Sequence, residues 1–339
     1  MPRHRKFDFT ISAAMLLATV TASVSPFTWT LGPERIHAYP SPHPYQFPDS
    51  AFAQLEGLSG DGSRLMFWTD GTTYRVEGAA SELFPSGVPS PLTPVLGEGP
   101  PRSYDANGNW LLAAFRLPTP GSIIAFTHVE DHNFSCPGGY AEWNAAAVVS
   151  SVDDGVSWTR QGLAISDPMP CAPTFGGSGF SSVLPARDGS GGFIAWGGCT
   201  AFRTSDPLAS SGSWSRYLDG SFSSPGINGS DSCLPGVPGN VCCPIVHWNT
   251  YLNAFVSIFT TWGNSSALFI ATSADGITFG TPQLLLSVPP PRSIAYGQII
   301  GASNSSSAGA IGTLVYAAAP PTSPYPRDFV YRTIEFSMA

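Results

Sequence analysis

The chain has 339 residues and a formal net charge of −8, and 11% of its residues are charged while 42% are hydrophobic. This hydrophobic content excludes a disordered chain, and the acidity argues against nucleic acid or an anionic membrane surface as a partner. The 36 Gly and 33 Pro divide short aromatic and β-branched runs, so the composition predicts an all-β protein without a long amphipathic helix.

The N-terminal segment is typical of a secretory signal peptide. Arg3, Arg5 and Lys6 precede an apolar run over residues 11–20, and small residues suited to cleavage follow it. The run is short for a membrane span, although an uncleaved anchor is the alternative. We therefore expect a signal peptide over residues 1–22 and a secreted, extracellular protein with no membrane partner after cleavage.

The expected strands fall into five groups along residues 23–339, which we interpret as a single domain. The first strands of these groups are Phe47–Glu56, Trp110–Phe115, Phe180–Pro185, Pro244–Thr250 and Tyr296–Ala302. The last group is one strand short, and Arg35–Tyr39 is expected to complete it by pairing the two ends of the chain. This closure removes exposed sheet edges, so we predict a five-bladed β-propeller with four-stranded antiparallel blades, or six blades as the alternative.

A repeated turn motif supports this interpretation. Residues 151–158 read Ser-Val-Asp-Asp-Gly-Val-Ser-Trp, and degenerate copies begin at Thr204 and Ser273. Asp and Gly favour tight turns, and the motif resembles the Asp-box of sialidases and related β-propellers. The repetition indicates a repeated blade, with unrelated Asp-Gly hairpins as the alternative. The resemblance implies that Trp158, Trp214 and Phe279 occupy equivalent places.

Three longer segments carry a second resemblance. Residues 67–75 (FWTDGTTYR), 123–132 (IIAFTHVEDH) and 244–259 (PIVHWNTYLNAFVSIF) resemble five-bladed propeller glycoside hydrolases of the arabinanase and fructosidase type. The likeness covers residues 35–336 at the level of the superfamily. It implies a glycoside-hydrolase-like protein that acts on a polysaccharide or glycoside by carboxylate general acid/base chemistry, without a cofactor. A fold alone does not fix a function, so the site residues must carry the case.

The starts of first strands and the ends of second strands are expected at one face of a propeller. The residues expected there are Asp49, Asp70, His128, Glu130, Asp131, His132, Trp196, His247, Asn249 and Trp262. Glu130 is predicted to be the general acid, because burial and neighbouring Asp131 would raise its pKa. Asp49 or Asp70 would be the base or nucleophile, although both could instead be turn residues.

The remaining candidates have binding roles. His128 is grouped with the catalytic residues, and the predicted substrate-binding residues are His132, Trp196, His247, Asn249 and Trp262. Tryptophan rings offer flat apolar surfaces to sugars, while a buried core histidine is the alternative for His247. No metal is predicted, although His128 and His132 with a carboxylate could bind one.

Other functions stay open. Phe115–Pro118 (FRLP) resembles the sialidase F-R-I-P motif, which would require further arginines such as Arg203, Arg292 or Arg332 to hold a carboxylate. A polysaccharide lyase would use His128 or His247 as its base. A lectin-like propeller would bind carbohydrate without catalysis, but the polar residues gather in the first two blades, which favours an enzyme. The sequence does not predict the oligomeric state.

Cysteine content agrees with export. All six cysteines lie in the middle third of the chain: Cys136, Cys171, Cys199, Cys233, Cys242 and Cys243. An even number in a secreted chain predicts that most are disulfide-bonded, with the pairing left open. A zinc site is the alternative, but the adjacent pair at positions 242 and 243 lacks C-x-x-C spacing.

Overall fold

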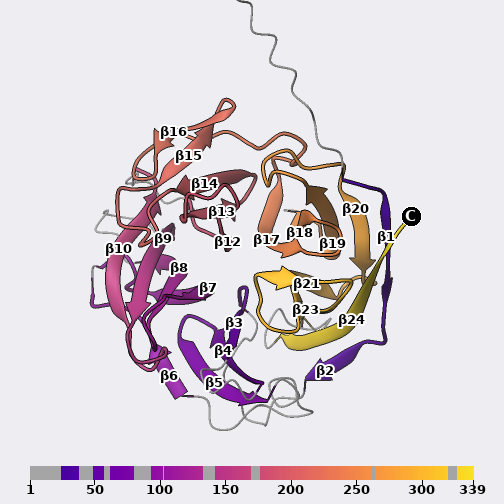
Figure 1. Cartoon of the computed structure of the whole chain (residues 1–339), viewed down its shortest axis with the longest axis horizontal. Helices are drawn as coiled ribbons and strands as arrows, with labels where there is room; N and C mark the ends of the chain where they lie inside the picture. The colour runs from indigo at the N-terminus through magenta and orange to yellow at the C-terminus, as the bar shows by residue number, and fades with distance from the viewer. Residues whose placement is uncertain are drawn as a thin grey trace, which may run out of the picture.

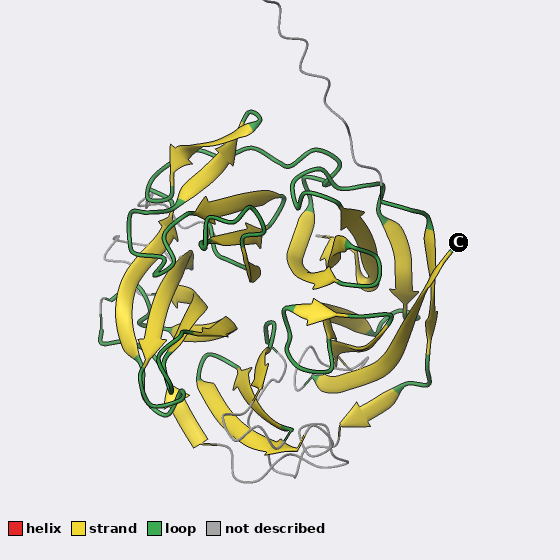
Figure 2. Ribbon diagram, in the orientation of Figure 1, coloured by secondary structure: helices red, strands yellow, loops and turns green. Residues whose placement is uncertain are grey.

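The fold is a five-bladed β-propeller, as the sequence predicted. The computed structural model describes residues 24–37, 49–56, 62–79, 93–101, 103–132, 142–168, 176–261, 264–319 and 327–339. Across these residues it contains strands, turns and loops but no helix, and hence no helix that could cross a membrane (Figure 2). Five mainly antiparallel sheets stand in a ring around a central axis (Figure 1). The expected signal peptide lies outside the described residues.

In the first three blades the strands follow chain order from the axis outward (Figure 1). The first blade consists of β3 (Ala53–Glu56), β4 (Ser63–Thr69), β5 (Thr73–Ala79) and β6 (Thr93–Leu96). The second consists of β7 (Gly108–Arg116), β8 (Ile123–Asp131), β9 (Trp143–Ser151) and β10 (Thr159–Ser166), with β11 (Gly176–Gly177) parallel to β9. The third consists of β12 (Ser182–Pro185), β13 (Phe193–Gly197), β14 (Thr200–Thr204), β15 (Ser215–Leu218) and β16 (Ser221–Pro225).

The last two blades complete the ring. The fourth consists of β17 (Val241–Asn249), β18 (Ala254–Thr261), β19 (Asn264–Ser273) and β20 (Gln283–Ser287), with β22 (Ser307–Ala308) parallel to β17. The fifth consists of β21 (Ser293–Ile300), β23 (Ile311–Ala319) and β24 (Asp328–Met338), and both β1 (Phe27–Leu31) and β2 (Arg35–His37) pair with β24. The predicted pairing of the two chain ends is therefore confirmed, although β1 supplies most of it and was not predicted.

An ion cluster fastens the N-terminal segment to the fifth blade. Glu34 lies between β1 and β2, and its carboxylate accepts hydrogen bonds from Arg292 (3.0 Å), Arg332 (2.9 Å) and the Tyr316 hydroxyl (2.9 Å). Partial burial raises the pKa of Glu34, but the hydrogen bonds from the two arginines outweigh it and the net pKa is lowered. The cluster therefore stabilises the ionised carboxylate and, with it, ring closure.

The turns between third and fourth strands share a hydrogen-bond pattern. The Ser151 hydroxyl accepts a hydrogen bond from the Gly155 amide (2.8 Å) and donates one to Asp153 (2.8 Å). The turn over residues 273–276 repeats both bonds, at 2.9 Å and 2.8 Å, and in the turn at 204–206 a threonine hydroxyl accepts from the Asp206 amide (3.0 Å). These aspartates serve turns at the outer part of the blades, away from the axis.

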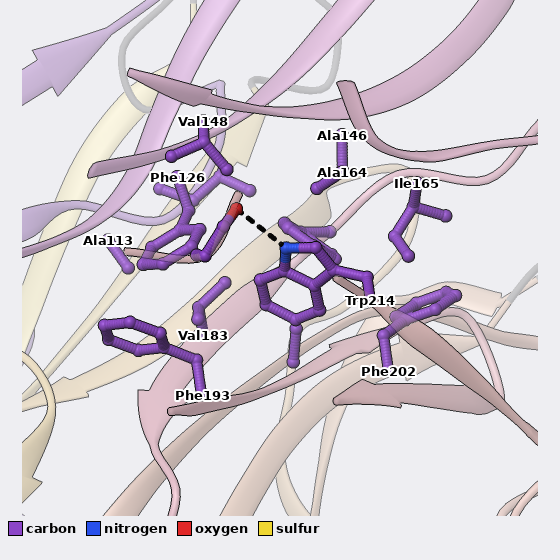
Figure 3. Close-up of a cluster of buried hydrophobic side chains, with 14 of the residues drawn as sticks. Ala113, Phe126, Ala146, Val148, Ala164, Ile165, Val183, Phe193, Phe202 and Trp214 are labelled. Carbon is purple, nitrogen blue, oxygen red and sulfur yellow. Dashed lines mark hydrogen bonds between the residues drawn. The ribbon is translucent and has the colours of Figure 1, made fainter. Parts of the chain in front are cut away.

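Large side chains fill the space between neighbouring blades. Between the second and third blades, Trp214 is buried among residues that include Phe126 and Ile165 (Figure 3). Its ring makes an edge contact with Phe126, with centroids 5.8 Å apart, and its indole nitrogen donates a hydrogen bond to the Ala209 carbonyl (3.2 Å). Such packing fixes the angle between blades and so the position of their inner strands.

Two of the four cysteines in the described residues form a disulfide. Cys199, in the turn between β13 and β14, forms a disulfide with Cys233, in the loop that follows β16. Cys242 and Cys243 lie next to each other at the start of β17 as thiols. The other two cysteines lie outside the described residues.

Candidate active site

A pocket of about 200 Å³ lies where the inner strands of the five blades converge. Every blade contributes to it: Asp49 precedes β3, Trp110 lies on β7, Phe180 precedes β12, Cys243 lies on β17 and Tyr296 lies on β21. Each of these five residues lies before the first strand of its blade or in the first half of that strand. The expected shared face is therefore present, and we call this cavity the channel pocket.

The second blade supplies a cluster of histidines and a glutamate. The Glu130 carboxylate forms hydrogen bonds with His128 Nε2 (3.2 Å) and His132 Nε2 (2.7 Å). The three residues alternate along the end of β8, so their side chains lie on one side of the chain. Burial raises the pKa of Glu130, but the hydrogen bonds from His128 and His132 outweigh it, and the net pKa is lowered. The expectation of a raised pKa at Glu130 is therefore wrong, and Asp131, which should have raised it, is buried on the opposite side.

Glu142 is a pocket residue that the sequence analysis missed. It directly precedes β9, whose start pairs with the end of β8 through Glu130↔Asn144. Burial raises the pKa of Glu142, and the negative charge of Glu130 raises it further. The signal was present in the sequence, since an acidic residue just before the third strand lies beside the end of the second.

Asp49 lies in the same pocket with different partners. Its carboxylate forms an ion pair with Arg327, and its other oxygen accepts a hydrogen bond from the Trp110 indole (3.2 Å). The Trp110 ring also makes an edge contact with His128, at 5.6 Å between centroids. Trp110 therefore connects Asp49 to the second-blade cluster. Neither Arg327 nor Trp110 was predicted as a site residue.

The other predicted residues lie elsewhere. Asp70 is in the β4–β5 turn, where its amide donates to the Thr72 carbonyl (3.2 Å), and it does not line the channel pocket. Trp196 is buried between blades, with its indole donating to the Gly276 carbonyl (2.9 Å). Asn249 is buried at the far end of β17, where its side chain orders the next turn. Trp262 lies outside the described residues.

His247 is buried near the far end of β17, away from the pocket. The strand begins at Val241 instead of the expected Pro244, so Cys243 takes the place at the mouth. Neither ring nitrogen of His247 has a hydrogen-bond partner among the described residues, and burial lowers its pKa to about 3. The burial of His247 matches the alternative of a core histidine, but that alternative expected a ring satisfied by hydrogen bonds, which the described residues do not provide.

Two residues of the channel pocket and the neighbouring His132 have the spacing of a cation site. Glu130, His132 and Glu142 each offer one ligand atom, and these atoms lie within 4.8 Å of one another. Imidazole and carboxylate ligands suit several divalent metals. The donor set differs from the alternative considered from the sequence, because Glu142 and not His128 completes it.

The arginines considered for a sialidase have other partners. Arg116 of the FRLP segment pairs with Asp154, and Arg203 pairs with Asp188. Arg292 and Arg332 both hold Glu34 at the outer part of the fifth blade. No arginine is among the described residues that line the channel pocket, and Arg327, behind it, is engaged by Asp49.

Comparison with known proteins adds information on the fold. No protein-family model and no curated protein matches the chain. The structure is similar to a family 117 glycoside hydrolase of the marine bacterium Zobellia galactanivorans, with a TM-score of 0.50, 9% identity and coverage of 93% of this chain and 91% of that one. It is also similar to an exo-1,5-alpha-L-arabinanase from a bovine ruminal metagenomic library (TM-score 0.48, 9% identity, coverage 84% and 94%) and to an alpha-L-arabinanase of Cellvibrio cellulosa (0.47, 12%, 81% and 89%). At these identities the likeness concerns the fold.

The buried His247 predicts a specific acid sensitivity. The pKa of His247 is about 3 in the folded protein, against an ordinary value of 6.5, so between these pH values the unfolded state binds the extra proton. Stability should therefore fall as the pH drops from 6.5 towards 3, by up to about 5 kcal/mol at ~1.4 kcal/mol per pKa unit. Urea unfolding of the wild type and of His247→Leu across this range should show a flatter pH dependence in the variant. Parallel curves for the two proteins would contradict the assignment.

Proposed function

We propose that the protein is a secreted glycoside hydrolase whose channel pocket cleaves a polysaccharide or glycoside by carboxylate acid/base chemistry. The observation that carries the proposal is that two carboxyl groups in one pocket have pKa values shifted in opposite directions, with a third carboxyl group beside them. Glu142 has a raised pKa, whereas Glu130 has a lowered one and Asp49 pairs with Arg327. Glycoside hydrolysis requires one protonated and one ionised carboxyl group.

In this proposal Glu142 is the general acid. Its raised pKa keeps a proton available for the glycosidic oxygen of the leaving group. Asp49 is the partner that activates water or attacks the sugar, and the hydrogen bond from Trp110 orients its carboxylate. The Trp110 ring, which also lines the pocket, offers an apolar surface to a sugar face.

Glu130 is then a positioning residue. An oxygen of Glu130 lies within 4.8 Å of one of Glu142, which is closer than the ~5–5.5 Å between carboxyl groups of retaining enzymes and the ~6.5–9.5 Å of inverting ones. Its two histidine partners keep it ionised, and its charge raises the pKa of Glu142. Glu130 therefore acts on the acid through the electric field in the pocket.

A lectin-like binding propeller is the second candidate, because Asp49 and Glu130 are both held in ion pairs that would also suit binding alone. The sialidase and lyase alternatives have less support. The sialidase arginines are engaged outside the pocket, and a uronate lyase would need a free base, whereas His247 is buried and His128 contacts Glu130.

The first test is a hydrolysis screen of the secreted protein. Substrates would include arabinan, β-1,3-galactan and nitrophenyl glycosides, chosen from the activities named for structurally similar proteins. Glu142→Gln should lower kcat by ~10²–10⁴-fold while leaving the fold intact, because it removes the acid. The exposed Glu335 offers a matched control, and Glu335→Gln should keep wild-type kcat. Saccharide binding without turnover by the wild type would favour the lectin-like alternative.

The second test uses the pH profile. The rate should fall as pH rises through the raised pKa of Glu142, because the acid loses its proton. Glu130→Gln removes a negative charge that raises this pKa, so it should move the alkaline limb of kcat/KM to lower pH. Glu335→Gln should leave the limb unchanged. An unshifted limb in Glu130→Gln would show that Glu142 is not the titrating acid.

A further inference from the structure

The start of β17 brings two adjacent cysteine side chains together. Neighbouring residues of a regular strand point to opposite faces, yet the Sγ atoms of Cys242 and Cys243 are 2.6 Å apart. Two local irregularities explain this. Cys243 has a left-handed backbone (φ 55°), and the pairing of β17 with β18 shifts register between Cys242 and Ile245. A positive φ is uncommon for a residue other than glycine, and such residues cluster at functional sites.

This pair lies in the wall of the channel pocket. Cys243 lines it together with Asp49 and Tyr296. Tyr296 also has a left-handed backbone, with φ 55°, so two constrained residues from adjacent blades face the same cavity. The negative charge of Asp49 contributes to the raised pKa of both Cys243 and Tyr296, which indicates that the three groups are close.

The surroundings of the pair suit thiol–disulfide chemistry. The same chain forms the Cys199–Cys233 disulfide, so its cysteines can be oxidised in the folded protein. The hydrogen bond from the Cys243 thiol lowers the pKa of Cys242, which favours its thiolate. A thiolate is the attacking species in disulfide exchange.

We propose that Cys242 and Cys243 are an oxidation site that closes to a vicinal disulfide in the pocket wall. The oxidant is a small-molecule or protein disulfide. The Cys242 thiolate attacks one of its sulfurs, and the first thiolate of the oxidant leaves. The Cys243 thiol then loses its proton and attacks the Cys242 sulfur, which expels the second thiolate. Two electrons and two protons pass from the cysteine pair to the two thiols of the oxidant.

The order of attack follows from the difference in pKa between the two thiols. Cys243 has a pKa raised well above its ordinary value, because it donates a hydrogen bond to Cys242 and is buried. Once Cys242 has entered the mixed disulfide, its negative charge is gone and this hydrogen bond is weakened. Cys243 can then lose its proton more readily. The site is independent of the proposed hydrolase activity, because it requires only these two residues and a disulfide oxidant.

Differential alkylation tests the proposal on the full chain. The protein would be exposed to oxidised glutathione, denatured, treated with N-ethylmaleimide without reduction, digested and analysed by mass spectrometry. We expect no label on the peptide with Cys242 and Cys243, and two labels after reduction. The Cys199–Cys233 pair is the internal control for intact oxidation. Two labels on the unreduced peptide, with the control pair still oxidised, would overturn the proposal.

A variant and a second probe identify the partner. In Cys243→Ser the reaction should stop at the mixed disulfide, so Cys242 should carry one glutathione on the unreduced peptide and become alkylated only after reduction. A Cys242 that is blocked without a bound glutathione would show that it pairs with another cysteine. Phenylarsine oxide captures two thiols that lie on the same side. The folded wild type with Cys242 and Cys243 as thiols and the Cys199–Cys233 disulfide intact should therefore bind it through this pair, and Cys243→Ser in the same state should not. Equal binding by the two proteins would contradict the geometry on which the proposal depends.

Discussion

Backbone pairing between β1 and β24 is the constraint on which the rest of the structure depends. Five consecutive residue pairs, from Phe27↔Met338 to Leu31↔Ile334, join the two ends of the chain in one sheet. Without them β24 would be the exposed outer edge of the fifth blade, and the N-terminal segment would no longer tie the last blade to the first. Beside these paired strands, the Glu34 carboxylate accepts hydrogen bonds from two arginines and a tyrosine of the fifth blade, which adds to the attachment. The channel pocket exists because the ring is closed.

Closure in turn forces carboxyl groups from different blades into one partly buried space. Burial disfavours every negative charge, and each additional charge disfavours the next. Hydrogen bonds from two histidines lower the pKa of Glu130 in spite of its burial. Asp49 forms an ion pair with Arg327. The pKa of Glu142 stays raised, because its remaining contacts do not offset its burial and the charge of Glu130. The pocket thus moves the pKa values of Glu142 and Glu130 in opposite directions. This division is the physical basis for the proposed chemistry.

Most of the architecture could be read from the sequence because its signals are local. Alternating apolar runs and Asp-Gly turns predicted the inner strands of every blade, and strand ends then brought Asp49 and Glu130 to one face. The site was less predictable because its details depend on irregular backbone. β17 begins at Val241, three residues earlier than expected, which places His247 away from the mouth. The pKa of Glu130 was also predicted wrongly, because Asp131 is next to Glu130 in the sequence but its side chain is buried on the other side of β8.

In the proposed mechanism, saccharide binds between Asp49 and Glu142 in the channel pocket. The most direct measurement is a crystal structure of Glu142→Gln with the oligosaccharide that the screen identifies. We expect a sugar ring against Trp110, with the glycosidic oxygen within hydrogen-bond distance of the side chain at position 142. A saccharide bound outside the channel pocket, such as in the surface groove beside Arg187 and Trp248, would contradict it.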